Sequence, residues 1–103
     1  PYVMSKHAVV GLTKSAAKEC AEMNIRVNSV NPSPVETKMM RVLEDGMSEI
    51  NGEEVNKETF EEQIPLGRYA DANEIAKLML FLSGDDSEFI TGSVHTIDGG
   101  FTA

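Results

Sequence analysis

The sequence is poor in several features on which whole classes of protein depend. It contains no tryptophan and a single cysteine, Cys20, so no disulfide can form within the chain. A lone thiol is typical of a reducing compartment, and we expect a cytoplasmic protein. No apolar run approaches the ~20 residues that span a bilayer, and no basic and then apolar leader opens the chain. We therefore expect no membrane partner.

Positive charge is also scarce. The chain has 9 lysines and arginines against 17 aspartates and glutamates, which gives a net charge of −8. The excess is local, because residues 41–62 contain eight acidic and two basic side chains. Such a stretch repels phosphate backbones, so we expect no nucleic-acid partner. It is most simply the solvated face of a surface insertion, and the alternative is an acidic binding patch.

The side chains that could bind a metal are few and scattered. His7 and His95 have no second ligand or partner at a spacing typical of a metal site, so we expect no metal and packing or surface roles for both. Cys20 has no adjacent base in the sequence that would make it a nucleophile, and we expect a buried or interface thiol.

The most informative residues that are present are Tyr2 and Lys6. Positions i and i+4 lie on one face of a helix, so the phenol and the ammonium group share the same space. A phenol ionises near pH 10 in water, and a nearby cation favours its ionised form. A phenol tuned in this way can donate or accept a proton at a carbonyl or alcohol oxygen. The alternative is that Tyr2 is an ordinary residue of an amphipathic helix.

The first half of the chain predicts a helix followed by a strand. Residues 2–22 are rich in alanine and lysine and contain no proline, which favours a helix that ends near Asn24. Residues 25–30 are β-branched and of strand length, and we expect the prolines at 32 and 34 to end that strand.

The second half predicts an insertion, a helix and a last strand. In residues 37–63 we expect two short helices, interrupted at Gly46 and at residues 51–52. A turn at 64–68 follows, and Asp71 with Glu74 forms a capping box at the start of the next helix. That helix carries a stripe expected to be buried, and residues 93–97 form a strand that ends in a turn at 98–100. The stripe consists of Ile75, Leu78, Met79 and Leu82.

This order of elements predicts the α/β fold class. A strand, an intervening helix and a second strand imply a right-handed crossover between parallel strands. Parallel strands are normally covered on both faces and belong to larger sheets. Two of them make a poor independent core, so we expect a piece of a larger sheet.

Seven landmarks of the chain together resemble a known family. They are Tyr2-Val3-Met4-Ser5-Lys6, the helix ending near Glu19, Ile25-Arg26-Val27-Asn28, Asn31-Pro32-Ser33-Pro34-Val35-Glu36-Thr37, Pro65-Leu66-Gly67-Arg68, Glu74-Ile75-Ala76 with Ile90-Thr91-Gly92, and Asp98-Gly99-Gly100. In this order and at these spacings, they resemble the C-terminal part of a classical short-chain dehydrogenase/reductase (SDR). The resemblance implies that residues 1–103 are the C-terminal fragment of one Rossmann-type domain with a doubly wound parallel sheet.

The resemblance also implies an activity. Members of the family transfer hydride between NAD(H) or NADP(H) and a carbonyl or alcohol substrate, which is a small molecule. It assigns Tyr2 as the general acid/base, and it assigns Lys6 to the hydroxyls of the nicotinamide ribose and to favouring ionisation of Tyr2. Tyr2 and Lys6 both also belong to the cofactor-binding residues that the resemblance implies. Among family members, the chain looks most similar to 3-oxoacyl-carrier-protein reductases and to sugar or polyol dehydrogenases.

Two further segments match functional parts of the family. The resemblance implies that the loop containing Pro32, Ser33, Val35 and Thr37 binds the cofactor; the alternative is a plain structural turn. Ser33 departs from the family pattern, because glycine is usual after this proline, and a backbone shape that only glycine adopts easily is therefore in question.

Residues of about 38–63 match the substrate lid. Its apolar residues could shape an adaptable wall, or they could only pack the short helices together. They are Met39, Met40, Val42 and Leu43, with Met47 further along.

Several parts of the family's machinery do not occur in these 103 residues. The glycine-rich dinucleotide turn and the catalytic serine are both absent from the sequence. We therefore expect the chain alone to be inactive, and the choice between NAD and NADP stays open. The family resemblance implies a homo-oligomer, a dimer or a tetramer, when the protein is complete. The alternative function is a non-catalytic oligomerisation or interaction piece derived from an SDR.

Overall fold

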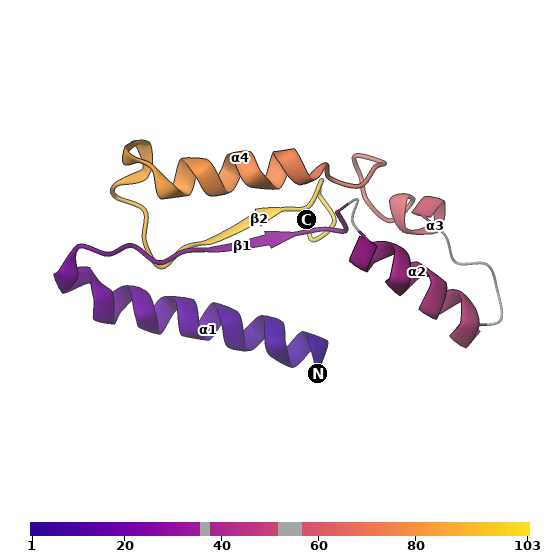
Figure 1. The fold of residues 1–103 in the computed structure, drawn as a ribbon, viewed down its shortest axis with the longest axis horizontal. Helices are drawn as coiled ribbons and strands as arrows, with labels where there is room; N and C mark the ends of the chain where they lie inside the picture. Colours follow the sequence, from indigo (N-terminus) through magenta and orange to yellow (C-terminus); the bar gives the residue numbers. More distant parts are fainter. Residues whose placement is uncertain (36–37, 52–56) are drawn as a thin grey trace. The chain divides into compact units, whose positions relative to one another are not determined.

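The computed structural model describes residues 1–35, 38–51 and 57–103. These residues form two compact units, the first with residues 1–31 and 77–96 and the second with residues 32–76 and 97–103. The elements, in chain order, are α1 (Tyr2–Cys20), η1 (Ala21–Met23), β1 (Ser29–Pro32), α2 (Lys38–Asn51), α3 (Lys57–Glu61), α4 (Ala72–Ser83), η2 (Asp85–Ser87) and β2 (Val94–Ile97), as labelled in Figure 1.

The first helix agrees with the prediction from composition. α1 begins at Tyr2, and the single 3₁₀ turn η1 continues it to Met23. Asn24 then adopts the left-handed conformation with φ of 58°, and its backbone N–H donates to the Ala21 carbonyl at 2.9 Å. Asparagine tolerates this conformation better than most residues, which is why the helix ends there. The predicted helix over residues 2–22 is confirmed.

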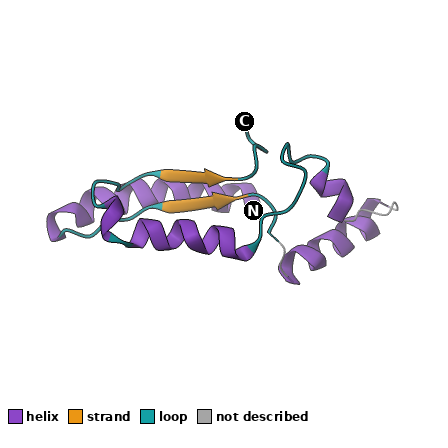
Figure 2. Cartoon of the chain, turned by 90° about the horizontal axis from the view of Figure 1, so that it is seen from above, coloured by secondary structure: helices purple, strands orange, loops and turns teal. Residues whose placement is uncertain are grey.

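The two strands are neighbours and run in the same direction (Figures 1 and 2). The Ser29 N–H donates to the Ser93 carbonyl at 3.0 Å, and the Ser33 N–H donates to the Ile97 carbonyl at 3.2 Å. Within the first unit, α1 lies on one side of this strand pair and the C-terminal half of α4 lies on the other (Figure 1). This arrangement confirms the α/β class predicted from the order of elements.

The bounds predicted for the first strand were wrong. β1 begins at Ser29 instead of residue 25, and it includes Pro32 as its last residue. The preceding segment makes other contacts instead of a strand ladder: the Val27 N–H donates to the Thr91 hydroxyl, and the Arg26 guanidinium donates to the carbonyls of Gly84 and Ile90. Pro32 is tolerated because it occupies the end of the strand, where the missing N–H interrupts no further ladder bond.

In the second unit, α2 is longer than predicted. Gly46 was expected to interrupt this segment, but α2 runs through it for 14 residues. A glycine inside a helix costs only about 1 kcal/mol relative to alanine, and apolar residues at helical spacing offset that cost. Of these, Met40 is buried in a cluster with Ile64 and Tyr69, against which Phe60 of α3 packs. The predicted interruption at residue 52 lies outside the described residues.

The start of α4 agrees with the predicted capping box, but the stripe of residues predicted to be buried was wider than the one observed. The Asp71 carboxylate accepts the Asn73 N–H, and the Glu74 carboxylate accepts the Asp71 N–H. Leu82 is buried, whereas Met79 is 55% exposed. A helix is about 10 Å across, while two paired strands lie about 4.8 Å apart. A two-stranded sheet therefore covers only part of the helix face. Among the described residues, no helix has the length and apolar character needed to cross a membrane.

The turn after β2 is the one predicted from Asp98 and the two glycines. The Asp98 carboxylate accepts the Gly100 N–H at 2.9 Å and the Thr102 N–H at 3.0 Å. Gly99 has a φ of 61°, and a Cβ placed there would lie 2.8 Å from Cγ2 of Ile64. Glycine is required at this position both for its backbone conformation and for the close approach of Ile64.

We predict that replacing Gly99 and Gly46 by alanine has opposite effects on the free energy of unfolding. Gly99→Ala should lower the free energy of unfolding by about 1–3 kcal/mol, because the left-handed backbone and the short contact to Ile64 both oppose a Cβ. The control Gly46→Ala has open space and a helical backbone, and it should raise stability by about 0.5–1 kcal/mol. Urea unfolding of the complete protein measures both. Equal effects would contradict the assigned turn.

The same turn predicts a dependence of stability on pH. The hydrogen bond from the Thr102 hydroxyl is the main cause that holds the pKa of Asp98 below its ordinary value of 3.8; partial desolvation opposes it, and backbone N–H groups add to it. A lowered pKa in the folded state means that the stabilisation is present above pH 3.8 and is lost as the pH falls through the folded-state pKa.

Thr102→Val should therefore lower the melting temperature at neutral pH, and the difference from wild type should shrink in acid. Thermal unfolding measured across acid and neutral pH checks this expectation. A difference that stays constant into strong acid would show that Thr102 acts through packing alone.

Candidate functional site

The predicted pair of Tyr2 and Lys6 comes together in the first turns of α1. The Lys6 ammonium nitrogen lies 5.6 Å from the centroid of the Tyr2 ring. The Ser5 N–H donates to the Pro1 carbonyl at 2.8 Å, an i, i+4 bond at the start of α1. The Ser5 hydroxyl donates to the same carbonyl at 2.7 Å. The i, i+4 spacing thus produces the juxtaposition that it predicts.

Both groups of the pair are available for chemistry. Tyr2 is 68% exposed, so a substrate oxygen could approach its hydroxyl. The ammonium of Lys6 is attracted to the face of the phenol ring, and it carries three N–H donors for hydroxyl groups of a ligand. The neighbouring His7 instead contacts the Val3 carbonyl through Nδ1 at 2.9 Å. The pair therefore combines a proton-carrying phenol with a cationic donor on one open helix face.

The loop after β1, predicted to bind a cofactor, is held firmly within the second unit. Pro32, Ser33 and Val35 are half-buried. The Ala70 N–H donates to the Pro34 carbonyl at 3.2 Å, and Val35 forms a parallel bridge with Ala70. The loop is thus tied both to β2, through the bond from Ser33 to Ile97, and to the segment before α4. Thr37, the remaining predicted residue, lies outside the described residues.

Glycine is usual in the family at the position of Ser33, which raised the question of a backbone conformation that only glycine adopts easily. Ser33 does not have such a conformation. Among the described residues, Asn24 is the only residue other than glycine with a positive φ. Ser33 therefore needs none of the conformational freedom of glycine.

The predicted lid residues on α2 divide into two groups. Met40 is 9% exposed and packs in the core cluster of the second unit. Val42 and Leu43 are 72% and 50% exposed, so they remain available to a ligand or to another part of the protein. Met39 falls within α2, but its side chain lies outside the described part of the structure. Met40 thus has the packing role, and a substrate wall at Val42 and Leu43 stays a prediction.

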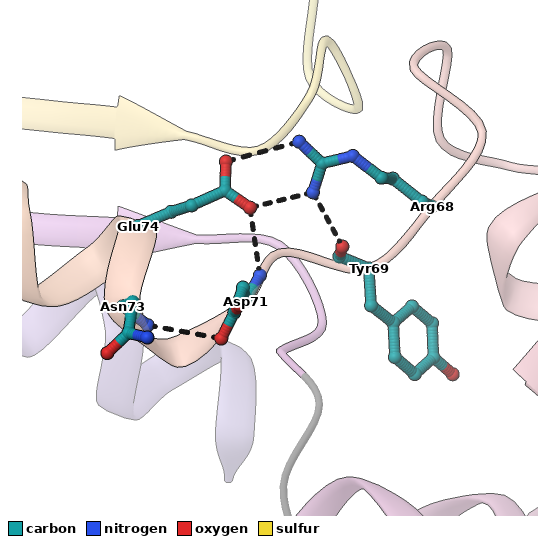
Figure 3. A network of polar contacts seen from close by, with 5 residues as sticks. All are labelled: Arg68, Tyr69, Asp71, Asn73 and Glu74. Carbon is teal, nitrogen blue, oxygen red and sulfur yellow. Dashed lines mark hydrogen bonds and ion pairs between the residues drawn. The ribbon is translucent and has the colours of Figure 1, made fainter.

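A polar network, which sequence reasoning found only in part, fixes the segment before α4 (Figure 3). The Arg68 guanidinium donates to the two carboxylate oxygens of Glu74 at 2.7 and 3.2 Å, and to the Tyr69 carbonyl at 3.1 Å. The capping interaction of Asp71 shares the same carboxylate. The Glu74 carboxylate raises the pKa of Arg68 through this hydrogen bond and through its charge. The sequence signal for Glu74 was the capping box; Arg68 appeared only as the last residue of the landmark Pro65-Leu66-Gly67-Arg68, which does not identify Glu74 as its partner.

Tyr69 is the residue that sequence reasoning missed. Its side chain is 5% exposed, and its hydroxyl donates to the Glu44 carboxylate on α2. The Lys57 ammonium lies 5.5 Å from the centroid of its ring. The only sequence signal was an aromatic residue between a turn and a capping box, which does not identify its partners.

The site residues are thus brought together in two groups. The first unit contains Tyr2 and Lys6, and the second contains the loop at 32–35 and the α2 residues. In the part of the chain that the structure describes, no group of three or more His, Cys, Asp and Glu side chains could hold a metal ion.

Known proteins are similar to this chain along nearly its whole length. A family model described as enoyl-(acyl carrier protein) reductase matches residues 1–102. The 3-oxoacyl-(acyl-carrier-protein) reductase FabG of Thermotoga maritima is 44% identical over 99 residues, which cover 96% of this chain and 37% of that protein. The chain therefore spans little more than a third of the length of this curated relative.

Solved structures agree. The crystal structure of a short chain dehydrogenase family protein from Francisella tularensis matches with a TM-score of 0.90 and 40% identity, covering 98% of this chain and 43% of that one. An actinorhodin polyketide ketoreductase variant, solved with NADPH, matches with a TM-score of 0.91 and 33% identity, covering 98% and 40%.

We predict that Glu74 stabilises the segment through two separable interactions. Glu74→Gln keeps an oxygen for the Asp71 N–H but loses the ion pair, which at an exposed site is worth about 0.2–1 kcal/mol. Glu74→Ala loses both, so its loss of stability should be larger, by about 1 kcal/mol. Urea unfolding at low and high salt measures the difference. The ion-pair component should shrink in high salt; equal losses for the two variants would contradict the capping role.

Proposed function

This chain belongs to the short-chain dehydrogenase/reductase family, and we propose that it is the C-terminal portion of one Rossmann-type domain in an NAD(P)-dependent oxidoreductase. The complete protein interconverts a carbonyl and an alcohol. The observation that carries the proposal is the Tyr2–Lys6 pair, with the ammonium 5.6 Å from the phenol ring on an exposed helix face. A phenol and a cation in this relation can serve proton transfer at a substrate oxygen.

The residues present fit a nicotinamide nucleotide. Lys6 supplies ammonium donors suited to the ribose hydroxyls, and the half-buried loop at 32–35 supplies backbone groups suited to a flat carboxamide. Because Ser33 and Pro34 are tied to Ile97 and Ala70, this loop loses little conformational entropy when a ligand binds. Thr37 completes the proposed cofactor contacts. When bound, the nicotinamide supplies or accepts the hydride.

The protein's own contribution to the chemical step is a proton. In reduction, the hydroxyl of Tyr2 donates its proton to the carbonyl oxygen as the carbonyl carbon gains hydride, so the product is an alcohol. In oxidation, the phenolate of Tyr2 accepts the proton of the alcohol. The ammonium of Lys6 supplies N–H donors that orient the bound ribose. This division of work assigns both side chains to one step.

We infer that α2 forms the substrate lid. The exposed Val42 and Leu43 offer an apolar surface, and Met39 and Met40 belong to the same segment. A 3-oxoacyl thioester is the substrate class we favour, because the matched relative from Thermotoga maritima is a 3-oxoacyl-(acyl-carrier-protein) reductase. A sugar or polyol would need polar partners that these exposed side chains do not offer.

The complete protein is, in this proposal, a cytoplasmic homo-oligomer. The apolar residues Val9 and Leu12 on α1 are 54% and 69% exposed in this chain. A second subunit that covers them would remove apolar area from water, which is a main driving force of association. The half-buried free thiol of Cys20 fits a reducing compartment.

We predict that Tyr2→Phe in the complete protein removes nearly all hydride transfer, by about 100-fold or more, because general acid/base catalysis contributes at least that much. Binding of the nicotinamide cofactor should change little, since the ring and Lys6 remain. The control Met4→Leu alters an exposed side chain in the same helical turn and should leave turnover unchanged. Steady-state kinetics and cofactor fluorescence titration provide the measurements. Near-normal turnover in Tyr2→Phe would refute the assignment.

A further inference from the structure

Tyr69 occupies the centre of the second unit's core cluster. Its side chain is 5% exposed and packs with Met40 of α2 and with Ile64. Its hydroxyl donates to the carboxylate of Glu44, which lies one helical turn beyond Met40 on α2. A hydrogen bond from a partly buried hydroxyl to a carboxylate is among the stronger ones in proteins. Two adjacent turns of α2 are thus attached to one side chain.

The backbone on either side of Tyr69 serves other parts of the same unit. Its carbonyl accepts a hydrogen bond from Arg68 at 3.1 Å, and Arg68 is paired with Glu74. The next residue, Ala70, donates to the Pro34 carbonyl at 3.2 Å. The ring points away from the Arg68–Glu74 pair (Figure 3). The backbone of residues 68–70 therefore holds the loop at 32–35, while the side chain of Tyr69 holds α2.

A third contact involves α3. The Lys57 ammonium lies 5.5 Å from the centroid of the Tyr69 ring, within the range of a cation–π interaction. Both helices of the proposed lid segment therefore contact the same aromatic side chain, although residues 52–56 between them lie outside the described structure.

From these contacts we propose that Tyr69 is a positioning residue: through its hydroxyl and Glu44, it holds helix α2 in register with the loop at 32–35 and so sets the affinity for the substrate. The inference rests on the proposed function, in which α2 forms the substrate lid and the loop binds the cofactor. Because only 5% of its side chain is exposed, Tyr69 acts in this proposal through α2 and not on the reacting atoms or the cofactor. Its loss should therefore affect the Michaelis constant, while the chemical step and cofactor binding stay as they were.

The kinetic test uses Tyr69→Phe in the complete protein, which keeps the ring in the apolar cluster and removes only the hydroxyl. The probe is acetoacetyl-coenzyme A, a soluble 3-oxoacyl thioester. We expect KM to rise about threefold to tenfold, because without the hydrogen bond to Glu44 the helix α2 also populates positions that bind the substrate poorly. The value of kcat and the dissociation constant of the cofactor should stay within twofold. An unchanged KM, or a parallel loss of kcat and cofactor affinity, would overturn the proposal.

Variants of Glu44 separate the hydrogen bond from general destabilisation. Glu44→Ala removes the acceptor and should raise KM as much as Tyr69→Phe does. Glu44→Gln keeps an amide oxygen as acceptor and should restore most of the affinity. The double variant should be no worse than either single one, since both remove the same bond. The matched control Asp45→Ala removes the exposed carboxylate of the next residue on α2 and should leave KM unchanged; a rise equal to that of Glu44→Ala would contradict the proposal.

A second readout does not depend on activity. Hydrogen exchange of backbone amides in α2 should be about tenfold faster in Tyr69→Phe, while amides of the C-terminal half of α4 keep their wild-type rates. Faster exchange confined to α2 in a protein without hydride transfer would support the positioning role of Tyr69 and reject the proposed function. Unchanged exchange in α2, or equal acceleration in α2 and α4, would reject the positioning role of Tyr69, whether or not the protein has the proposed activity.

Discussion

The pairing of two short parallel strands is the constraint on which the rest of the structure depends. β1 and β2 are adjacent, yet more than sixty residues separate them in the chain. Parallel neighbours cannot be joined by a tight hairpin, so the intervening chain must form a crossover. The insertion with α2 and α3, the turn at 64–68 and the helix α4 all belong to that connection. The turn at Asp98 follows directly from the end of β2.

The connection is held mainly by one short segment. Residues 68–70 lie between the turn and α4, and each makes contacts through a different group. Arg68 binds through its guanidinium, Tyr69 through its side chain and its carbonyl, and Ala70 through its backbone N–H. The groups that these three residues contact lie on α2, on α4 and in the loop after β1. This segment therefore joins elements that are distant in sequence. A surface ion pair alone contributes little; here it matters because it fixes a backbone to which the other contacts are attached.

The chemistry follows the same division between local and long-range structure. The phenol and the ammonium of the proposed catalytic pair need only one helix to meet. The loop at 32–35 needs β2 and Ala70 to hold its shape, and the lid helix needs Tyr69. The juxtaposition of the phenol and the ammonium can thus be predicted from spacing alone, whereas the parts proposed to position a cofactor and a substrate depend on contacts between separate segments.

Local geometry explains what the sequence by itself determined. Tyr2 and Lys6 meet because positions i and i+4 share a helix face; Asp71 and Glu74 cap a helix three residues apart; and Asp98 with two glycines closes a turn within five residues. Only the tertiary structure decided where β1 begins, since the backbone of Ser29 pairs with that of Ser93, which is distant in the chain. It likewise decided that α2 continues through Gly46, that Met79 stays exposed and that Tyr69 meets Glu44. The free energy of those features comes from partners distant in the chain, and no local pattern of residues specifies which partners they will be.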